Sequence, residues 1–385
     1  MDAMPNLKVI HVASGDLWGG AEAQLLTLAK QLQARSNVEV TVVLLNYGQL
    51  EERLAEHKIS TIVFDEQKMG FLSILVGLIK LFNEKRPQVI HSHRQKENIL
   101  ASLANVLTVR AKCLRTQHGA PEFQYSWRQL HKKIQQRLDT FCGRFLQSKV
   151  IAVSEELADK LKASFPSTHI EVIENGVDQE LLKSNCAIAP FKREQPTARH
   201  VGIVGRLVPV KRIDLFLAMA KAFIANEAHD SDVQFHIIGD GPLRVELEQQ
   251  AESLAISNRV TFHGHINNIA DYIFSLDILM MCSDHEGLPM TAIEAMALET
   301  PVVSHNVGGL KHFYQERKGG ILSQQHSADS YLVEVHALLN NSKAYEDVCK
   351  SGLEVVNTIL SAERNADKII QLYEVLVQQR IEYDN

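Results

Sequence analysis

The sequence contains few cysteines, and none is placed to form a disulfide framework or a zinc site. Its five cysteines are widely scattered, are odd in number and include no CxxC pair, whereas both kinds of site need regular, close spacing. We therefore expect a protein of a reducing compartment, the cytoplasm.

Long apolar runs and targeting segments are also missing. The longest apolar run, residues 69–79, ends at Lys80 and is well short of the ~20 residues that span a bilayer. The N-terminal segment contains the acidic Asp2 and no basic region, and its apolar stretch is too short for a signal peptide. The sequence therefore predicts neither a transmembrane segment nor a secretory signal.

The composition is otherwise that of an ordinary globular protein. The chain has 385 residues, 45% of them hydrophobic and 22% charged, and this length exceeds what one hydrophobic core usually serves. The formal net charge is -6, but residues 1–190 are net basic and residues 191–385 net acidic. Two domains are expected, and the basic excess hints at an anionic surface near the first.

Short apolar runs alternate with longer amphipathic stretches, a pattern typical of a parallel sheet wrapped by helices. The first series of expected strands comprises residues 7–13, 38–45, 60–64, 88–93, 112–118 and 149–154. After a polar stretch that contains prolines the pattern restarts, with expected strands at 200–205, 233–239, 259–264, 277–282 and 301–305. The sequence therefore predicts an α/β protein of two Rossmann-like domains that face a cleft.

The expected domain bounds follow from this alternation and from turn residues. The first domain is expected at 1–185, a linker at 186–199 and the second domain at 200–361. A C-terminal helix at 362–385 is expected to pack back on the first domain.

Charged residues follow two expected strands of the second domain, and ligands bind at the carboxyl ends of such strands. Arg206 and Lys211 follow one strand, and such a pair favours a diphosphate ligand over two merely exposed charges. Glu286 lies in a turn with glycine and proline, and Glu294 lies eight residues later in an apolar helix. A carboxylate in such a helix needs a partner or a ligand, because burying it alone is costly. Both carboxylates could accept hydrogen bonds from sugar or ribose hydroxyls.

Two features of the first domain are weaker signals. Gly19 and Gly20 precede an expected helix and could let an anion approach its N-terminus, although a simple tight turn is the favoured interpretation. His118 ends an expected strand, where it is either a structural residue or a group that faces the cleft.

Together these residues resemble the retaining, nucleotide-sugar-dependent glycosyltransferases of family four (glycosyltransferase group 1), which have the GT-B fold. The resemblance rests on the spacing of Glu286 and Glu294 within EGLPMTAIEAMA, and on GRLVPVKRID, NGVD, VTFHGHI, TPVV and VGG. It extends over nearly the whole chain.

The resemblance implies a role for each site residue. Glu286 would bind hydroxyls of the donor sugar, Glu294 would bind the ribose, and Arg206 and Lys211 would hold the diphosphate. His118 would lie close to the donor sugar and would orient it. The other implied donor-binding residues are Gly19, Gly20, His265, Ile266, Gly287, Leu288 and Thr291.

The resemblance also implies the reaction. A hexose-type sugar would pass from a nucleotide-sugar bound by the second domain to a hydroxyl of a glycan or lipid-linked acceptor bound by the first. The anomeric configuration would be retained, and the product would belong to cell-surface polysaccharide or lipopolysaccharide synthesis. Cationic side chains and helix N–H groups can meet the charge on the leaving nucleotide, so neither a metal nor another cofactor is expected.

Two patterns that could suggest a metal are better explained otherwise. The acidic pair Asp230 and Asp232 precedes an expected strand and so lies at the amino end, away from the cleft. His91 and His93 share one face of a strand end, but no third ligand is evident, and zinc sites need three or four.

Three features depart from the family pattern. The usual acid after VGG is absent, and His312 stands near its place. Glu299 stands where the family has a glycine before TPVV, and Pro289 removes one backbone N–H from the turn that would face the sugar. These changes concern details of the donor and leave the reaction class unaltered.

The stretch 126–149 combines apolar residues at helical spacing with a basic surface. The favoured interpretation is a helix whose apolar face lies in the core and whose basic face is solvated. The alternative is contact with anionic lipid at the inner face of the cytoplasmic membrane, which would suit a lipid-linked acceptor.

Two other functions stay open at this point. A nucleotide-sugar epimerase of GT-B fold would carry additional acids around the sugar, and a non-catalytic module would bind the nucleotide-sugar without forming a product. A periplasmic sugar-binding protein is disfavoured because no signal sequence is recognised, and no nucleic-acid partner is expected.

Overall fold

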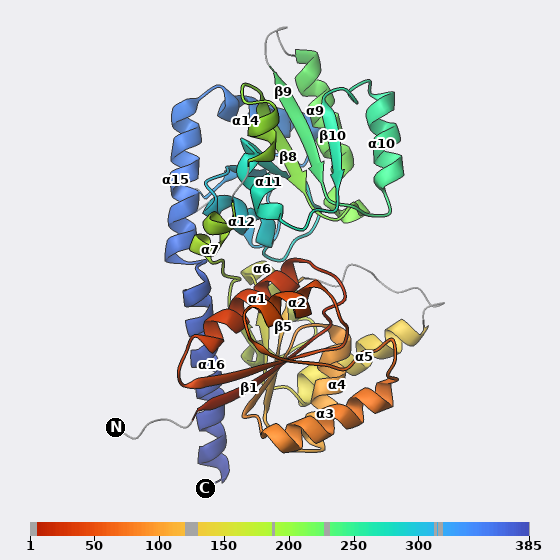
Figure 1. Cartoon of the computed structure of the whole chain (residues 1–385), viewed down its shortest axis with the longest axis vertical. Helices are drawn as coiled ribbons and strands as arrows, with labels where there is room; N and C mark the ends of the chain where they lie inside the picture. The colour runs from red at the N-terminus through yellow and green to blue at the C-terminus, as the bar shows by residue number, and fades with distance from the viewer. Residues whose placement is uncertain are drawn as a thin grey trace. The chain divides into compact units, whose positions relative to one another are not determined.

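The computed structural model describes residues 6–119, 130–186, 189–226, 232–311, 314 and 319–384. The chain divides into two compact units, one formed by Met1–Gly176 with Ala362–Asn385 and the other by Val177–Ser361. Each unit contains one parallel sheet flanked by helices (Figure 1). The predicted α/β class with two Rossmann-like units is confirmed.

The sheet of the first unit has the strand order β3-β2-β1-β4-β5-β6-β7. Its strands are β1 (Leu7–Ala13), β2 (Val38–Leu44), β3 (Ser60–Val63), β4 (Val89–Ser92), β5 (Lys112–Gln117), β6 (Lys149–Ala152) and β7 (Ile170–Val172). Its helices are α1 (Gly20–Gln33), α2 (Gln49–Glu56), α3 (Phe71–Lys85), α4 (Gln95–Val106), α5 (Leu130–Phe145), α6 (Glu155–Leu161) and α16 (Ala362–Asp384). The order reverses between β1 and β4, which pair in parallel.

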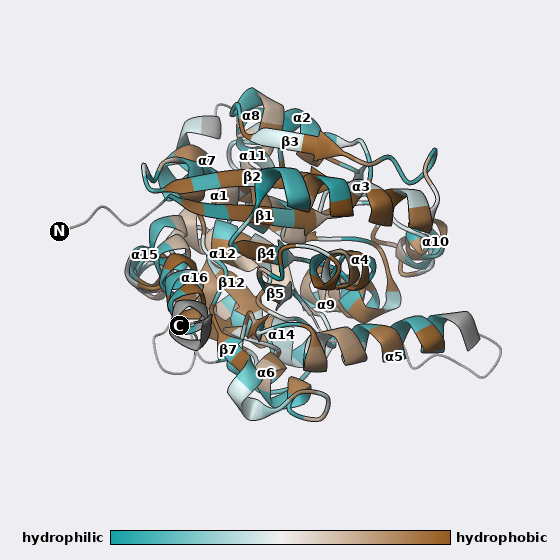
Figure 2. Cartoon of the chain, turned by 90° about the horizontal axis from the view of Figure 1, so that it is seen from below, coloured by the Kyte–Doolittle hydropathy of each residue, from teal (hydrophilic) through white to brown (hydrophobic). Residues whose placement is uncertain are grey.

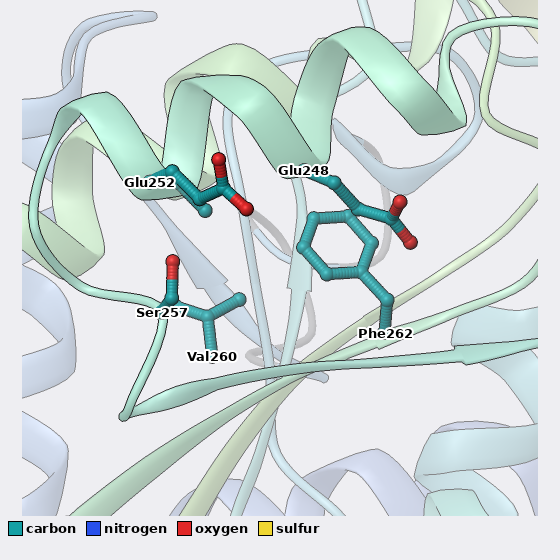
Figure 3. Close-up of a pocket in the computed structure, with 6 residues that line it drawn as sticks. Glu248, Glu252, Ser257, Val260 and Phe262 are labelled. Carbon is teal, nitrogen blue, oxygen red and sulfur yellow. The ribbon is translucent and has the colours of Figure 1, made fainter.

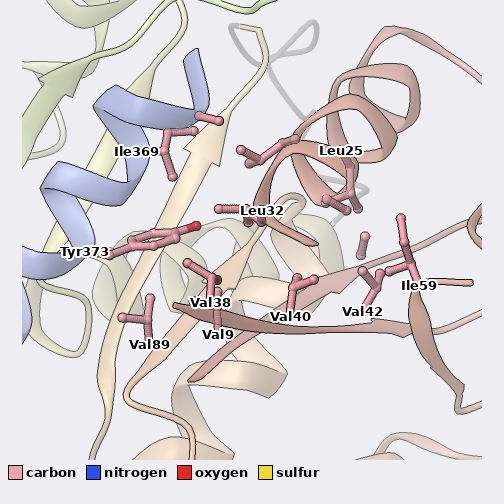
Figure 4. Packing of buried hydrophobic residues seen from close by; sticks show 14 of the residues in the cluster. Val9, Leu25, Leu32, Val38, Val40, Val42, Ile59, Val89, Ile369 and Tyr373 are labelled. Carbon is pink, nitrogen blue, oxygen red and sulfur yellow. The ribbon is translucent and has the colours of Figure 1, made fainter. Parts of the chain in front are cut away.

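Both faces of this sheet are covered, as the nearly continuous apolar runs of its strands require. Alternate residues of β1 enter different cores, since Val9 packs with α1 and α16 whereas Ile10 packs with α3 and α4. Figure 4 shows the first of these cores, with Leu25 and Leu32 of α1 and Tyr373 of α16 over the strands. The C-terminal helix is thus part of the first core.

The sheet of the second unit has the order β10-β9-β8-β11-β12-β13. Its strands are β8 (Arg199–Val204), β9 (Val233–Ile238), β10 (Val260–Gly264), β11 (Ile278–Met281), β12 (Val302–Ser304) and β13 (Ile321–Leu322). Its helices are α7 (Gln179–Asn185), α8 (Pro190–Glu194), α9 (Ile213–Asn226), α10 (Arg244–Ser253), α11 (Ile269–Ser275), α12 (Met290–Ala297), α14 (Ala328–Leu339) and α15 (Ser342–Thr358). Here the order reverses between β8 and β11.

The structure divides the chain at a different place from the expected bounds. The first unit ends at Gly176, before the limit of 185, and the range expected to be a linker, 186–199, contains α8. Helix α8 is fixed to the second unit because its buried Phe191 stacks on His236 of β9, with ring centroids 3.7 Å apart.

Helix α5 presents its apolar residues to solvent. Brown apolar segments recur along this helix in Figure 2, and four large apolar side chains one or two turns apart are exposed. They are Ile134 (57% exposed), Leu138 (37%), Phe141 (51%) and Phe145 (65%). The favoured interpretation of 126–149, an apolar face buried in the core, is therefore wrong for the described part, and residues 126–129 lie outside it.

The described helices include none that combines the length and the apolar character needed to cross a bilayer.

Candidate active site

The topology of the second sheet places two loops side by side. Because the strand order reverses between β8 and β11, the loops that follow these neighbouring strands lead to different sides of the sheet. Such a switch point is where open α/β sheets bind ligands. The loop after β8 carries Arg206 and Lys211, and the loop after β11 carries Glu286.

Lys211 and Glu286 form an ion pair at this switch point. The Nζ of Lys211 donates a hydrogen bond to Oε1 of Glu286 at 2.5 Å, and the side chains are 25% and 11% exposed. Lys211 ends a short 3-10 turn, and Arg212 follows it in the left-handed region at φ +49°. Lys211 and Glu286 were predicted as separate ligand-binding groups, and the structure brings them into contact.

Backbone contacts hold the turn of Glu286 in place. The N–H of Asp284 donates to the carbonyl oxygen of Val210 at 2.8 Å, which joins the two loops directly. The N–H of Gly309 donates to the carbonyl oxygen of Gly287 at 2.6 Å. Gly308 has φ +57°, and a Cβ there would lie 2.5 Å from the carbonyl oxygen of Glu286. A glycine is needed at this approach.

An electrostatic cluster that the sequence did not indicate lies behind this turn. Nη1 of Arg212 donates to Asp284 at 3.2 Å, and Asp214 and Asp284 raise the pKa of the Arg212 guanidinium. His326 stacks on His305 at 3.8 Å, and its Nδ1 lies 3.6 Å from the Asp284 carboxylate. No motif spacing connects these residues, so sequence patterns alone could not have found them.

Arg206 lies at the same edge of the sheet, and its side chain is exposed. The N–H of Leu207 donates to the carbonyl oxygen of Asp240 at 3.0 Å, which fixes the loop to the end of β9. Among the described residues no ion pair is recorded for the Arg206 guanidinium. It therefore lies near the Lys211 loop without sharing its carboxylate partner.

The remaining second-unit candidates lie on two elements. Thr291 and Glu294 are the two half-buried residues of α12 up to Ala297, and their spacing of three places them on the same face. Glu294 is thus less buried than its apolar neighbours predict. His265, exposed, and Ile266, half-buried, follow β10 directly. Leu288 and Gly287 are buried in the turn before α12.

In the first unit, Gly19 and Gly20 are exposed at the N-terminus of α1, after β1. The sequence did not indicate the charges around them. Arg94, which follows β4, donates to the buried Glu22 at 2.5 Å and lies 3.5 Å from Asp16. Burial raises the pKa of the Glu22 carboxyl, and the charge of Arg94 opposes this shift.

His118 follows β5 and is half-buried. Its Nε2 lies 3.3 Å from Nδ1 of His93, and burial, with a smaller contribution from Arg94, lowers its pKa to about 4. His118 lines a cavity of about 350 Å³ within the first unit, together with Arg94, Gln117 and other residues.

A second pocket, lined by Glu248, Glu252, Ser257, Val260 and Phe262, contains none of the predicted site residues (Figure 3).

One group in the described part of the chain has potential metal ligands close together. His11, His91 and His93 are buried, and their ligand atoms all lie within 4.8 Å of one another. Each ring already makes hydrogen bonds to protein groups, including one of 2.9 Å between Nδ1 of His11 and Nε2 of His93. Of the acidic pair Asp230 and Asp232, Asp230 lies outside the described residues.

Comparison with known proteins gives matches over most of the chain. The family model "Glycosyltransferase Family 4" matches residues 18–181, and "Glycosyl transferases group 1" matches residues 187–354. A curated relative, the Escherichia coli UDP-Gal:alpha-D-GlcNAc-diphosphoundecaprenol alpha-1,3-galactosyltransferase, is 23% identical over 95% of this chain and 96% of its own. The Streptomyces fradiae 2-deoxystreptamine N-acetyl-D-glucosaminyltransferase is 27% identical over 78% of this chain and 77% of its own.

A solved structure also matches the whole architecture. Anabaena HepE in complex with UDP-glucose superimposes with a TM-score of 0.81 at 20% identity, covering 96% of this chain and 100% of that chain. At this identity the match shows that the two proteins share a fold.

Proposed function

This chain belongs to the group 1 glycosyltransferases of family four, of GT-B fold, and on that premise we propose the reaction that it performs. It transfers a hexose-type sugar from a nucleotide-sugar donor to a hydroxyl of a glycan or lipid-linked acceptor. The anomeric configuration is retained, and the product belongs to cell-surface polysaccharide or lipopolysaccharide synthesis. The E. coli relative, whose name gives a UDP-sugar donor and a diphosphoundecaprenol-linked acceptor, supports this choice of substrates.

The observation that carries the proposal is the ion pair of Lys211 and Glu286 at the switch point of the second sheet. An ammonium group has three donors, so Lys211 can bind a donor diphosphate while it still contacts Glu286. The carboxylate of Glu286 can then accept hydrogen bonds from sugar hydroxyls. The ion pair thus prepares one cation for the leaving group and one anion for the sugar.

The chemistry that follows needs charge stabilisation more than a protein base. The bond between the anomeric carbon and the diphosphate oxygen breaks, and the acceptor oxygen forms a new bond to that carbon from the same side. The acceptor proton passes to a phosphate oxygen of the leaving nucleotide. Arg206, Lys211 and the N-terminal N–H groups of α12 stabilise the charge that develops there, so no metal is required.

The other donor contacts are proposed from the resemblance to the family. Glu294 binds the ribose and Thr291, on the same face of α12, lies beside the diphosphate. The backbone at His265 and Ile266 contacts the nucleobase. From the first unit, His118 orients the donor sugar, and the loop of Gly19 and Gly20 approaches the diphosphate.

The exposed apolar residues of α5 support a lipid-linked acceptor. Ile134, Leu138, Phe141 and Phe145 are accompanied by exposed basic residues on the same helix, Lys132, Arg137 and Arg144. An amphipathic helix of this kind binds an anionic bilayer by inserting its apolar residues and placing its basic residues among the headgroups. We assign α5 to contact with the inner face of the cytoplasmic membrane.

A donor panel tests the reaction. The protein is incubated with nucleotide-sugars that differ in base and sugar, with glycan and lipid-diphosphate acceptors, and both transfer and slow donor hydrolysis are measured. We expect one nucleotide-sugar class to be consumed with formation of nucleoside diphosphate. Conversion of the donor into an epimer would identify an epimerase, and tight binding without any turnover would identify a binding module.

Two further measurements test the mechanism. The anomeric proton coupling of the product should match that of the donor, and inversion would overturn the proposed same-side attack. Activity should survive an excess of chelator. Loss of activity that magnesium or manganese restores would show that the cations of the protein do not suffice.

A further inference from the structure

Two ion pairs join the loop after β8 to the turn after β11. Lys211 pairs with Glu286 at 2.5 Å. The next residue, Arg212, donates from Nη1 to Oδ1 of Asp284 at 3.2 Å, and Asp284 stands two residues before Glu286. The N–H of Asp284 also donates to the carbonyl oxygen of Val210 at 2.8 Å. The residues on both sides of Lys211 therefore contact the same residue, Asp284.

The backbone of Arg212 is in an unusual conformation for an arginine. Its φ is +49°, in the left-handed region that a glycine adopts freely but that costs free energy for a residue with a Cβ. The N–H of Arg212 donates to the carbonyl oxygen of Pro209, and its own carbonyl oxygen accepts from the N–H of Leu215. The residue thus connects the 3-10 turn that carries Lys211 directly to α9. Strained residues of this kind cluster at functional sites.

The guanidinium of Arg212 is oriented towards Asp284 by a second carboxylate. Nε and Nη2 donate to the two carboxylate oxygens of Asp214, at 3.0 and 2.9 Å, and such a two-point contact fixes the plane of the group. Nη1 then reaches Asp284. His326 is a weaker partner of Asp284, since its Nδ1 lies 3.6 Å from that carboxylate, beyond hydrogen-bond distance. Among the described residues, Arg212 is the closest cation to Asp284.

We propose that Arg212 and Asp284 are positioning residues that hold the Lys211 loop and the Glu286 turn in register for the donor. This inference rests on the proposed function, in which Lys211 and Glu286 contact the donor.

The need for a second ion pair follows from the charge that develops in the reaction. Lys211 contacts Glu286 in the structure, but a bound diphosphate offers its ammonium group further anionic oxygens. As negative charge builds on the leaving group, Lys211 is drawn towards it and its hold on Glu286 weakens. Arg212 and Asp284 have no role in binding the donor, so their ion pair persists and keeps the two loops preorganised.

A role in stability alone would give a different result. The side chains of Arg212 and Asp284 are 32% and 40% exposed, and ion pairs at such positions add little to the free energy of unfolding. Arg212→Gly removes the ion pairs and also the backbone strain, and these two effects on stability oppose each other. The stability of the variant should therefore change little, whereas the two loops should be less well held.

Hydrogen–deuterium exchange tests the positioning without reference to activity. The amide of Asp284 bonds to Val210, and the amide of Gly309 bonds to the carbonyl oxygen of Gly287, so peptides with these amides report on the loop contact and on the turn. In Arg212→Gly we expect exchange to be about fivefold faster than in the wild type, the upper end for the loss of a partly exposed ion pair. Unchanged exchange in folded Arg212→Gly would overturn the proposal.

Arg110→Gly is the matched control. Arg110 is an exposed arginine of the first unit at φ +50°, so the substitution relieves the same kind of backbone strain without altering either loop. Exchange at the amides of Asp284 and Gly309 should remain that of the wild type. Equal acceleration in Arg110→Gly and Arg212→Gly would contradict a specific role for Arg212.

Should Arg212→Gly fail to fold, Asp284→Ala breaks the same ion pair from the other side. Exchange is then followed at Gly309, because the substitution alters the intrinsic exchange of residue 284, and it should again be faster. Asp284→Asn keeps an oxygen that can accept from Arg212 and should restore most of the protection. Asp367→Ala is the control, since it removes a comparably exposed ion pair with Arg35 in the first unit. Wild-type exchange at Gly309 in Asp284→Ala would contradict the proposal.

Kinetics supply the link to the reaction. A misplacement of about 1 Å can lower a rate about a hundredfold. Because the backbone bond between the loops remains in Arg212→Gly, we expect kcat to fall roughly tenfold and by more than the donor KM rises. In a Lys211→Ala background the same substitution should lower kcat by less than about threefold, since the cation that Arg212 positions is already absent.

Two losses that multiply would show that Arg212 does not act through Lys211. Absence of transferase activity in the wild type would count against the proposed function alone, because the exchange is measured independently.

Discussion

Lys211 is the side chain on which the proposed chemistry depends most. If it holds the diphosphate more strongly as the bond breaks, Lys211→Ala should lower kcat by more than it raises the donor KM. Removal of a charge-stabilising donor of this kind costs about 2.7 to 4 kcal/mol, so we expect a fall in kcat of roughly a hundredfold or more. Steady-state kinetics with saturating donor measure it.

Lys221→Ala is the control for this substitution, because Lys221 is an exposed lysine of the neighbouring helix α9 and should retain wild-type kinetics. Arg206→Lys should lower kcat by less than Lys211→Ala does, since an ammonium keeps the charge but loses the planar two-point contact of a guanidinium. A wild-type kcat in Lys211→Ala would assign leaving-group stabilisation to the N–H groups of α12 instead.

Glu299 provides a prediction about stability. It follows α12 at φ +60°, and the N–H of Thr300 donates to the carbonyl oxygen of Ala295 at 2.9 Å, which is the helix-ending motif in which glycine is usual. Glu299→Gly removes a left-handed strain of roughly 1 to 2 kcal/mol. It also loses the exposed ion pair with Lys183, which contributes roughly 0.2 to 1 kcal/mol. We expect a higher free energy of unfolding, measured by urea denaturation.

The matched variant is Glu299→Ala, which loses the same ion pair but keeps a Cβ at positive φ. It should be less stable than the wild type, whereas Glu299→Gly should be more stable. Equal stabilities of the two variants would show that backbone strain at this position is negligible.

The exposed apolar residues of α5 lead to a prediction about the binding of this helix to membranes. Replacing Phe141 and Phe145 together by serine removes two large apolar side chains that are 51% and 65% exposed. Because binding to a bilayer scales with the apolar area that enters it, sedimentation with anionic liposomes should fall strongly. Leu107→Ser is the control, since Leu107 is 65% exposed elsewhere in the first unit. Equal sedimentation of all three proteins would exclude α5 from lipid contact.

The same helix shows what periodicity can and cannot predict. Spacing identified the apolar face of α5, but it contains no information about what covers that face, so the expected burial was wrong. Most strands were found because buried parallel strands read as continuous apolar runs. β7, of three residues, and β13, of two, are too short to give such a signal. The range that contains α8 was predicted to be a linker because its proline was interpreted as a turn residue. This residue, Pro190, instead stands at the start of the helix.

The site was partly predictable because chain topology brings strand ends together. Lys211 and Glu286 each follow a strand in the sequence, and the switch point makes those strands neighbours. Their direct ion pair, and that of Arg94 with Glu22, depend on side-chain positions that no local pattern encodes. The roles assigned to Glu294, His265 and the remaining donor contacts stay predictions.

The histidines of both units make the stability of the whole chain sensitive to acid. Burial lowers the pKa of His11 in the first unit, and of His236 in the second, to about 3. The unfolded chain binds these protons below about pH 6.5, whereas the folded chain does not until about pH 3. The unfolded state therefore binds more protons in this window, and the free energy of unfolding falls as the pH falls from about 6.5 towards 3.

Carboxyl groups whose pKa burial raises act in the opposite sense, and they include Glu22, Glu97, Asp139 and Glu334. Burial raises the pKa of Glu97 to about 6, so the folded chain binds a proton before the unfolded chain does, and this group stabilises the first unit as the pH falls from about 6 to 4.5. The histidines whose pKa is lowered outnumber these carboxyl groups. At about pH 5, each fully neutral buried histidine lowers the free energy of unfolding by about 2 kcal/mol relative to neutral pH.

Urea denaturation followed by circular dichroism at about pH 7.5 and about pH 5 measures this effect, and His236→Phe isolates one contribution to it. Phenylalanine can keep the stacking of this ring on Phe191 but loses the hydrogen bonds of His236 to His200 and His263, so the variant should be less stable than the wild type at neutral pH. Because phenylalanine cannot bind a proton, the variant should lose less stability on acidification. Tyr272→Phe is the control, because it alters a ring of the same aromatic cluster without removing a histidine, and it should keep the wild-type pH dependence. An unchanged pH dependence in His236→Phe would mean that His236 is protonated equally in the folded and unfolded chains.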